Sequence, residues 1–449
     1  MSTRITARPA AFRWAGWVLV VALFVRAGLW FAYPLAESND SLTYRYLARS
    51  LVNHGFERYN GTRTPGYPVF LMLLGADGLL YAIQLSLGLL ITLLVFYIAW
   101  SISRRAWFAG LLALAHTLNP GQFFFEGAIL SETLATFLLF CMLAGLVWLW
   151  TPTSPGVGNT KSGDFVLRIG IPLAIGLAAA LLALTRPLFA FLPFWAGLFL
   201  AFAWRPAPPK LRWSVAILAA LPALVSLAAW TNFLHTRFNT WGMDSIAGYH
   251  LVNHVSSFFE RVPDEYALIR DTFLDFRARQ IAESGTPINT IWGAIPTLMK
   301  RTRLNYYSLG RQMGQVSLRL VIEHPGLYAR NLLLGWGWFW RVGVFWLPET
   351  ISSPPLRETL KTLMLAVRAA LIGVNSLFVA GSLALILPKI RAAFKMNLFL
   401  WFAASAIWLT SIIQTLAEHG DNPRYLVPMQ SLVVFIVACW AVNLVESRR

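Results

Sequence analysis

The chain contains little charge. Asp, Glu, Lys and Arg make up only 13% of its 449 residues, about half the share that is typical of soluble domains, which excludes an ordinary soluble protein. Only two cysteines are present, Cys141 and Cys439, and both lie inside apolar runs, so no disulfide framework can be inferred. The sequence has no Walker loop and no Gly-x-Gly-x-x-Gly pattern, so nothing indicates a nucleotide-binding domain.

Hydrophobic residues are abundant instead, at 57% of the chain. They are gathered into long runs, and a run of about 20 apolar residues can cross a bilayer as a helix. The sequence therefore predicts an all-α polytopic membrane protein with about ten transmembrane helices. The predicted crossings lie near 13–35, 77–101, 106–119, 131–151, 166–185, 188–204, 213–233, 363–388, 397–417 and 425–445.

The 37 Lys and Arg residues exceed the 20 Asp and Glu residues and give a net charge of +17. Lys and Arg cluster in short loops that stay cytoplasmic, and with ten crossings all six clusters fall on one side. Both termini are then cytoplasmic, and the surplus sets orientation rather than binding nucleic acid. The clusters are Arg4, Arg8 and Arg13; Arg104 and Arg105; Lys161 and Arg168; Arg205, Lys210 and Arg212; Lys389, Arg391 and Lys395; and Arg448 and Arg449.

The aromatic run Asn331–Trp346 is the weak point of this topology, because it could be an eleventh crossing. We interpret it as an interfacial segment, since Trp is enriched at the bilayer surface and Arg341 interrupts the run. The chain then divides into three parts, the second of which is an external, largely helical domain. The parts are 1–234, a transmembrane module with its first external loop at 37–76; 235–361, the external domain; and 362–449, the C-terminal transmembrane helices.

Polar residues gather at the outer ends of the predicted helices. Charged groups at membrane depth are costly and are candidates for function. The third helix is short and is expected to break at Asn119-Pro120. The outer clusters are Asp40, Ser41, Tyr44 and Arg63; Asn119, Pro120, Glu126, Ser131 and Glu132; Arg186 and Pro187; and His419, Asp421, Arg424 and Tyr425.

Each cluster also has a purely structural interpretation. Asp40-Ser41 could cap the helix 42–52, since such side chains accept hydrogen bonds from free backbone N–H groups. Ser131-Glu132 could simply begin the fourth crossing, where acidic residues meet the positive end of a helix. Arg186 and Arg424 could extend to lipid headgroups.

The order of these motifs resembles one family. The stretch Asn39-Asp40-Ser41, followed by Arg63-Thr64-Pro65-Gly66-Tyr67-Pro68, is similar to the GT-C glycosyltransferases that use polyprenyl-phosphate sugars. This group contains the protein O-mannosyltransferases and the aminoarabinose transferase of lipid A. Three further stretches agree with it: Asn119-Pro120 with Leu130-Ser131-Glu132, Leu184-Thr185-Arg186-Pro187, and Arg424-Tyr425-Leu426-Val427-Pro428.

The resemblance implies a GT-C-like fold and a catalytic base at Asp40. The donor would be a polyprenyl-phosphate-linked sugar, and the acceptor, a lipid, a glycan or a protein, stays open. The family often has an acidic pair where this chain has Asp40-Ser41, which leaves open whether Asp40 and Glu132 hold a divalent cation such as Mg²⁺ or Mn²⁺. The substrate-binding residues that it implies are Tyr44, Arg63, Tyr67, Glu132, Arg186, Arg424 and Tyr425.

The expected reaction is direct displacement with inversion, on the external face of what the resemblance suggests is a bacterial inner membrane. Two other functions remain open. A secondary transporter or flippase would also use many helices, although it usually shows paired halves. A polymerase or ligase that uses diphosphate-linked glycans would place its key arginines in the external segment, at Arg261, Arg270, Arg277, Arg279 and Arg311.

Overall fold

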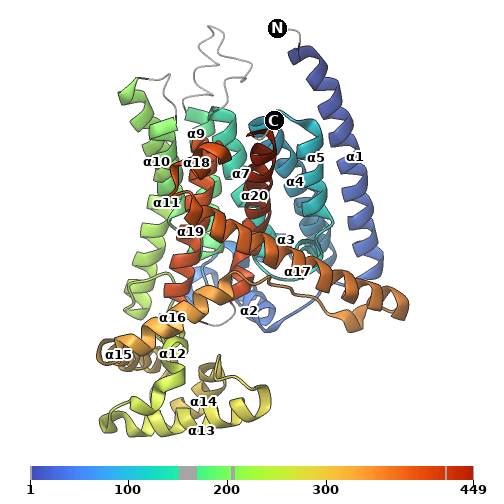
Figure 1. Ribbon diagram of the computed structural model, residues 1–449. Helices are drawn as coiled ribbons and strands as arrows, with labels where there is room; N and C mark the ends of the chain where they lie inside the picture. The colour runs from blue at the N-terminus through green and yellow to red at the C-terminus, as the bar shows by residue number, and fades with distance from the viewer. Residues whose placement is uncertain (1–2, 151–168, 204–207, 420–421, 448–449) are drawn as a thin grey trace.

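The computed structural model describes residues 3–150, 169–203, 208–419 and 422–447. Over these residues the chain is helical, and its one β-type contact is an isolated bridge. Figure 1 shows a bundle of long helices with a group of shorter helices at its lower end. The predicted basic cluster Lys161 and Arg168 lies outside the described residues, as do Arg205, Arg448 and Arg449.

Within the described residues, seven helices are long and apolar enough to cross a membrane, and three shorter apolar helices accompany them. Each of the ten predicted crossings coincides with one of these helices, so the chain is a multi-pass membrane protein; that all ten cross stays a prediction. The long helices are α1 (Thr3–Ala32), α4 (Asp77–Ser103), α7 (Glu132–Trp150), α11 (Pro209–Phe238), α17 (Pro354–Ala384), α19 (Leu398–Ala417) and α20 (Gln430–Ser447), which follows the 3₁₀ segment η7 (Asn422–Met429). The shorter helices are α5 (Ala106–Thr117), α9 (Ile171–Thr185) and α10 (Leu192–Ala203).

Three predicted cytoplasmic segments meet at one end of the bundle. Arg105, between α4 and α5, forms an ion pair with Glu446 near the end of α20. Lys395, which ends the short helix α18 (Pro388–Phe394), lies 3.9 Å from the same carboxylate. Helix α1 begins at this end as well (Figure 1). The arrangement agrees with the grouping of the basic clusters on one side.

The predicted break in the third crossing is confirmed. Helix α5 ends at Thr117 and α6 (Pro120–Glu126) begins directly after it. The Asn119 side chain accepts a hydrogen bond from the Gly121 backbone N–H at 2.9 Å, and Pro120 takes the first helical position, where a missing N–H costs nothing. The chain can therefore turn within the bundle without leaving backbone groups unpaired.

Glu126 does not belong to the outer polar cluster in which the sequence placed it. Its carboxylate faces the interior of the bundle and binds Arg26 of α1, with nitrogen–oxygen distances of 2.5 and 2.9 Å. Arg26 also donates to the Thr117 hydroxyl. Both charged residues are buried, and a Cβ at Gly88 of α4 would collide with the Glu126 carboxyl group. The broken helix turns this acid inward, which no sequence periodicity could reveal.

The segment 235–361, which the sequence predicts to be external, is helical and has a hydrophobic core of its own. Its helices are called the external helices below, after that prediction. Its helices pack through buried side chains such as Phe259, Phe273, Leu298 and Met313. The elements are α12 (Ala247–Val255), η4 (Ser256–Arg261), η5 (Asp264–Tyr266), α13 (Ala267–Ser284), α14 (Thr290–Thr302) and α15 (Tyr306–Glu323).

The aromatic run is only partly helical. Helix α16 (Pro325–Phe339) lies obliquely across the lower end of the bundle (Figure 1), and the chain then continues without regular structure to η6 (Pro348–Thr350). Trp336 stacks on Trp408 of α19 with 5.8 Å between ring centroids. Helix α17 then begins at Pro354, earlier than the predicted crossing, and runs obliquely across the other helices.

The first external loop is anchored to the segment that follows α6. Ala36 donates its N–H to the Gly127 carbonyl at 2.7 Å, and Ile129 donates to the Ala36 carbonyl at 3.0 Å. These two bonds form the isolated parallel bridge between Ala36 and Ala128. They hold the start of α2 (Asn39–His54) beside the start of α7. The other helical elements of this loop are η1 (Gly55–Arg58) and α3 (Gly66–Leu74).

Replacing Arg26 by Met should destabilise the bundle by about 3–5 kcal/mol, because Glu126 would be left as an unpaired buried charge. The double replacement Arg26→Met with Glu126→Met removes both charges and should recover much of the loss. The midpoint of thermal unfolding of the purified protein in detergent measures both. A double variant no more stable than Arg26→Met would show that the pair does not account for the loss.

Candidate active site

Helix α2 is capped by Ser38, not by Asp40 or Ser41 as the structural interpretation of the sequence supposed. The Ser38 hydroxyl accepts from the Ser41 backbone N–H, while the Ser38 N–H donates to the Ser41 hydroxyl oxygen at 2.8 Å. This reciprocal arrangement is a capping box. The Ser41 hydroxyl also donates to the Ile129 carbonyl at 2.8 Å, so α2 is fixed against the segment before α7. Asp40 therefore has no capping function.

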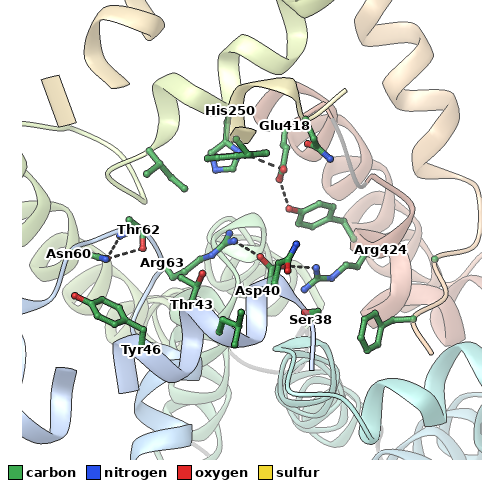
Figure 2. A pocket seen from close by; sticks show the side chains of 18 of the residues that line it. Ser38, Asp40, Thr43, Tyr46, Asn60, Thr62, Arg63, His250, Glu418 and Arg424 are labelled. Atoms are coloured by element: carbon green, nitrogen blue, oxygen red, sulfur yellow. Dashed lines mark hydrogen bonds and ion pairs between the residues drawn. The ribbon is translucent and has the colours of Figure 1, made fainter. Parts of the chain in front are cut away.

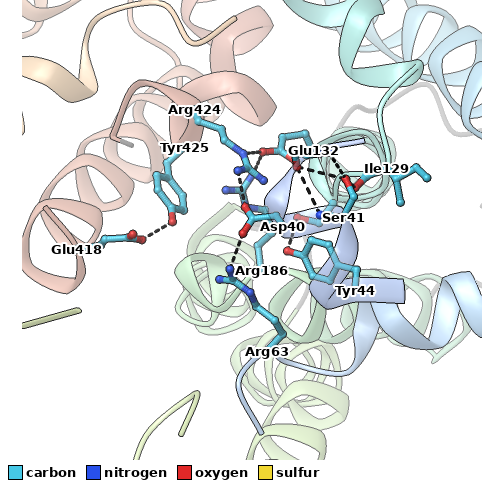
Figure 3. A network of polar contacts seen from close by, with 12 residues as sticks. Asp40, Ser41, Tyr44, Arg63, Ile129, Glu132, Arg186, Glu418, Arg424 and Tyr425 are labelled. Atoms are coloured by element: carbon cyan, nitrogen blue, oxygen red, sulfur yellow. Dashed lines mark hydrogen bonds and ion pairs between the residues drawn. The ribbon is translucent and has the colours of Figure 1, made fainter. Parts of the chain in front are cut away.

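The Asp40 carboxylate lies between two guanidinium groups. One oxygen accepts from Arg63 at 2.6 Å and the other accepts from Arg424 at 2.6 Å. Arg424 also donates to the Glu132 carboxylate, and Arg186 lies 3.1 Å from the same Glu132 oxygen. Figure 3 shows these five side chains as one continuous network, in which three arginines face two acids.

Two tyrosines line this network. The Arg186 guanidinium carbon lies 4.7 Å from the centroid of the Tyr425 ring, and the Arg63 guanidinium carbon lies 5.8 Å from that of Tyr44. Cations over tyrosine rings are attracted by the electrons of the ring face. The sequence predicts eight site residues, and seven of them, all except Tyr67, therefore lie in or against this ion network. They come from loops and helices far apart in the chain.

Tyr67 is the exception. Its ring packs against that of Tyr44 with 4.9 Å between centroids, its hydroxyl donates to Gln84 at 2.9 Å, and it is fully buried. Like the fully buried Glu132, it is not among the side chains that line the two cavities described below, and unlike Glu132 it binds none of the three arginines. Tyr67 thus supports Tyr44 from behind rather than facing a substrate. Asp421, from the fourth outer cluster, lies outside the described residues.

The sequence missed two members of the site, Glu418 and His250. The Tyr425 hydroxyl donates to one Glu418 oxygen, and the His250 Nδ1 lies 3.6 Å from the other. Glu418 follows α19 directly, so an acid at the outer end of a helix was a usable signal. His250 lies on α12, and nothing in its local sequence indicates that α12 folds back onto the bundle.

The ionic surroundings shift the pKa values of the acids outside the membrane-spanning helices. Burial alone would raise the pKa of the Asp40 carboxyl, but the Arg63 and Arg424 guanidiniums outweigh it, and that pKa is lowered. Burial would also raise the pKa of Glu418, whereas His250 and the Tyr425 hydrogen bond lower it to about 2. Glu418 in turn raises the pKa of His250 against the effect of burial. Both carboxylates are therefore ionised at neutral pH.

Two glycines allow the arginines to come this close. A Cβ at Gly66 would lie 2.6 Å from the Leu184 carbonyl oxygen and 2.7 Å from the Thr185 nitrogen. A Cβ at Gly343 would lie 2.8 Å from both the Pro423 carbonyl oxygen and the Arg424 Cα atom. Gly66 thus lets the Arg63 loop contact the backbone that carries Arg186, and Gly343 lets the chain after α16 contact the backbone of Arg424.

Two cavities meet at the ion network. The larger, of about 1200 Å³, opens between α2 and the external helices, and the smaller, of about 140 Å³, reaches towards Arg186 and Ser131. Figure 2 shows Asp40 in the larger cavity between Arg63 and Arg424, with His250 and Glu418 nearby. The side chains that line both cavities are Asp40, Thr62, Arg63, His250, Glu418, Arg424 and Tyr425.

Asp40 and Glu132 are the carboxylates that the resemblance offers to Mg²⁺ or Mn²⁺, and Mg²⁺ in proteins is usually held by one or two carboxylates together with water. Among the described residues, no group of three or more His, Cys, Asp or Glu lies together. Both carboxylates are also bound by arginines, whose positive charge would repel a second cation. No step of the chemistry below therefore depends on a metal.

Acidification should weaken the protein through Glu418. Because its folded pKa of about 2 lies below that of the unfolded chain, its stabilisation is present above about pH 4.5 and is lost as the pH falls towards 2. We expect the free energy of unfolding to drop more steeply between pH 6 and pH 3 in wild type than in Glu418→Gln. Unfolding in detergent as a function of pH measures this. The exposed Glu349 serves as a control, since Glu349→Gln should keep the wild-type change of unfolding free energy with pH. If this change is equal in wild type and Glu418→Gln, the pairing of Glu418 is contradicted.

No protein-family model and no curated protein sequence matches this chain. Three solved structures are similar to it, all of the oligosaccharyltransferase AglB from the archaeon Archaeoglobus fulgidus. The one tethered to an acceptor peptide has a TM-score of 0.49 at 14% identity, over 97% of this chain and 50% of that chain. The complex with an inhibitory peptide and a dolichol-phosphate has a TM-score of 0.48 at 15% identity, over 97% and 50%. The chain spans about half the length of these structures, and at such low identity the similarity assigns no activity to it.

Proposed function

We propose that this chain is an integral membrane glycosyltransferase that moves a sugar, a hexose or a pentose, from a polyprenyl monophosphate to an acceptor hydroxyl. The observation that carries the proposal is an ionised carboxylate, Asp40, placed between two arginines at the wall of a cavity of about 1200 Å³. A base and anion-binding cations are the two groups that such a transfer requires. The motif order in the sequence supports the same assignment.

In the proposed step the acceptor oxygen attacks the anomeric carbon while the bond from that carbon to the phosphate oxygen breaks. The bonding electrons go to the phosphate, which leaves as polyprenyl phosphate, and the acceptor proton goes to Asp40. General base catalysis of this kind contributes roughly 10²- to 10⁴-fold. One displacement inverts the anomeric configuration and needs one base, in contrast to the two carboxylates of a retaining hydrolase.

The arginines would serve the leaving phosphate. Charge accumulates on its oxygens as the bond breaks, and preorganised cations stabilise that charge more in the transition state than in the ground state. Arg424 can use two nitrogens, since its guanidinium already spans Asp40 and Glu132. Glu132 and Tyr425 would hold Arg424 and Arg186 in place, because Glu132 is fully buried and binds both guanidiniums.

A donor phosphate would also change Asp40. Arg63 and Arg424 lower the pKa of Asp40 and so weaken it as a base while no anion competes for them. A phosphate that takes over hydrogen bonds from these arginines removes part of that stabilisation, and the carboxylate becomes more basic when the substrate is in place. The same two guanidiniums would thus connect donor binding to activation of the base.

The larger cavity has an apolar side that suits a prenyl chain. Leu42, Phe125, Val344 and Phe345 line it there, and the Leu42 side chain is largely exposed. Burying apolar chain surface against such residues is favourable at about 25 cal/mol per Å². A lipid carrier would enter along this side from the membrane and present its phosphate to Arg424. The proposed face is the one where α2 lies, which the grouping of the basic clusters predicts to be external. A bacterial inner membrane is proposed on the family resemblance alone.

The two alternative functions have less support in the structure. The five external arginines of the diphosphate-linked hypothesis do not line either cavity, and Arg270 and Arg277 are occupied by Asp264, Asp271 and Glu260. For a transporter, the buried Arg26–Glu126 pair would be the natural coupling site. The cavity beside Glu126 measures only about 10 Å³, which is room for about one water molecule.

Replacing Asp40 by Asn should lower turnover by about 10²- to 10⁴-fold, because Asn keeps the shape but cannot accept the proton. The measurement is the release of polyprenyl phosphate from a panel of polyprenyl-phosphate sugars by the purified protein in detergent. Slow transfer to water makes an acceptor unnecessary. Thermal unfolding of the same samples verifies that Asp40→Asn is folded.

Two variants serve as controls for this experiment. Asp77→Asn removes another carboxylate near the membrane surface, one that binds Arg45 outside both cavities, and should keep wild-type turnover. Arg279→Ala tests the diphosphate-linked hypothesis, and it should be equally harmless. The proposal fails if Asp40→Asn turns over as fast as wild type, or if no monophosphate-linked donor is consumed.

Chelators should leave the rate unchanged. Arginines, not metal ions, neutralise the leaving phosphate in this arrangement, so EDTA and added Mg²⁺ or Mn²⁺ are each expected to alter donor turnover by less than twofold. Initial rates before and after dialysis against EDTA measure this. A loss of activity on chelation that one divalent ion restores would contradict the arginine mechanism.

A further inference from the structure

The larger cavity has a second side that the proposed transfer step does not use. It is formed by Asn60 of the first external loop together with Gln280, Asn289, Trp292, Tyr306 and Tyr307 of the external helices α13, α14 and α15. We call these six residues the amide–aromatic wall. Figure 2 shows Asn60 on the far side of Arg63 from Asp40, beside Thr62 and Tyr46.

The aromatic rings of the wall are held in place by their neighbours. Tyr306 packs against Tyr249 with 5.1 Å between ring centroids, and Trp292 lies 5.4 Å from the His250 ring. The Tyr307 hydroxyl donates to the Asn60 carbonyl oxygen at 3.3 Å. The rings thus offer fixed flat surfaces, which a ligand can contact with little loss of side-chain entropy.

The amides of the wall keep hydrogen-bonding capacity that the fold uses only in part. Asn289 precedes α14 with a φ of +68°, yet its side chain makes no capping hydrogen bond to that helix. It is exposed, and its side-chain oxygen accepts a hydrogen bond from the Asn253 amide at 3.4 Å. Gln280 lies on α13, and its amide reaches the Ser284 hydroxyl at 3.3 Å. Both amides can donate and accept hydrogen bonds.

The wall carries no charge. Among the described residues that line the larger cavity the only Lys or Arg side chains are Arg63 and Arg424, and both are at the Asp40 end. A phosphorylated or carboxylated ligand would need charge-assisted partners along its length. Hydroxyl groups, in contrast, donate and accept and are matched by neutral amides, while the C–H faces of sugar rings are apolar and suit aromatic rings.

We propose that the amide–aromatic wall binds a neutral saccharide, and that this saccharide is the acceptor. Its acceptor role rests on the proposed transferase function, whereas the binding itself does not. The sugar of the donor is attached to the phosphate and so stays near Arg424, and the volume of about 1200 Å³ exceeds the roughly 300–1,000 Å³ of a single-ligand pocket. A glycan on the wall would place a hydroxyl at Asp40 from the side opposite to the lipid.

Saccharide binding can be measured without any donor. Saturation-transfer difference NMR on the full-length protein in detergent would use maltotriose, cellotriose, mannotriose and chitotriose as probes, with a Ser- and Thr-containing peptide and lipid A as comparators. We expect at least one trisaccharide to bind and the peptide and lipid A not to compete with it. Binding of the peptide or lipid A alone, or of no trisaccharide, would overturn the proposal.

Variants assign the binding to the wall. Gln280→Ala combined with Asn289→Gly removes both amides, and glycine accepts the positive φ at position 289. The loss of two neutral hydrogen bonds should raise the Kd of the trisaccharide about tenfold. Gln315→Ala removes an exposed amide of α15 that does not line the cavity, and it should keep the wild-type Kd. An unchanged Kd in the double variant would overturn the assignment to this wall.

Kinetics separate the acceptor from the sugar of the donor. With a donor that wild type consumes, the bound trisaccharide should accelerate the release of polyprenyl phosphate above the rate of transfer to water and should itself be glycosylated. The double variant should then raise KM for the trisaccharide about tenfold, and more than KM for the donor. A rise in donor KM alone would overturn the acceptor role. If trisaccharide binds but no donor is consumed, the transferase proposal fails while the saccharide site stands.

Discussion

The carboxylate of Asp40, shared between Arg63 and Arg424, is the contact on which the rest of the site depends. Burying charges is costly unless they are paired and hydrogen-bonded, so the fully buried Glu132 could not be placed here without its arginines. The bridge between Ala36 and Ala128 and the close backbone approaches at Gly66 and Gly343 bring the first loop, the start of α7 and the segments that carry Arg186 and Arg424 to one point. The geometry of the outer face follows from the need to satisfy this set of charges together.

Much of the helical framework could be predicted from the sequence, because apolar runs long enough to cross a membrane have few other structures available. The convergence of Asp40, Glu132 and Arg424 followed from motif order and from their common membrane side. His250 could not be found in this way, since its position depends on how α12 packs against α16 and the bundle. Tyr67 shares the motif Arg63–Pro68 with Arg63, but neighbouring side chains of a short helix face different directions. Membership of the motif therefore does not show that Tyr67 faces a substrate.

Glu126 and Glu132 show why sequence position alone misplaces an acid. Both are buried, both bind arginine, and only one short turn of chain separates them. The break at Asn119-Pro120 directs Glu126 towards α1, where Arg26 and Thr117 surround it. Glu132 is also fully buried, but its partners Arg424 and Arg186 line the two cavities that meet at the ion network. The two acids thus differ in what their arginines face: Arg26 stays inside the bundle, whereas Arg424 and Arg186 reach cavities.

The site is divided between two parts of the chain. The bundle and its first loop supply the base and the arginines, whereas α13 to α15 supply the amide–aromatic wall. The His250–Glu418 contact joins the two parts directly at the edge of the charged network. Because the external helices have a separate hydrophobic core, their cavity-facing side chains can change without disturbing the ion pairs around Asp40. In the proposed transferase, such a division would let the chemistry stay constant while the external helices determine which acceptor hydroxyl reaches Asp40.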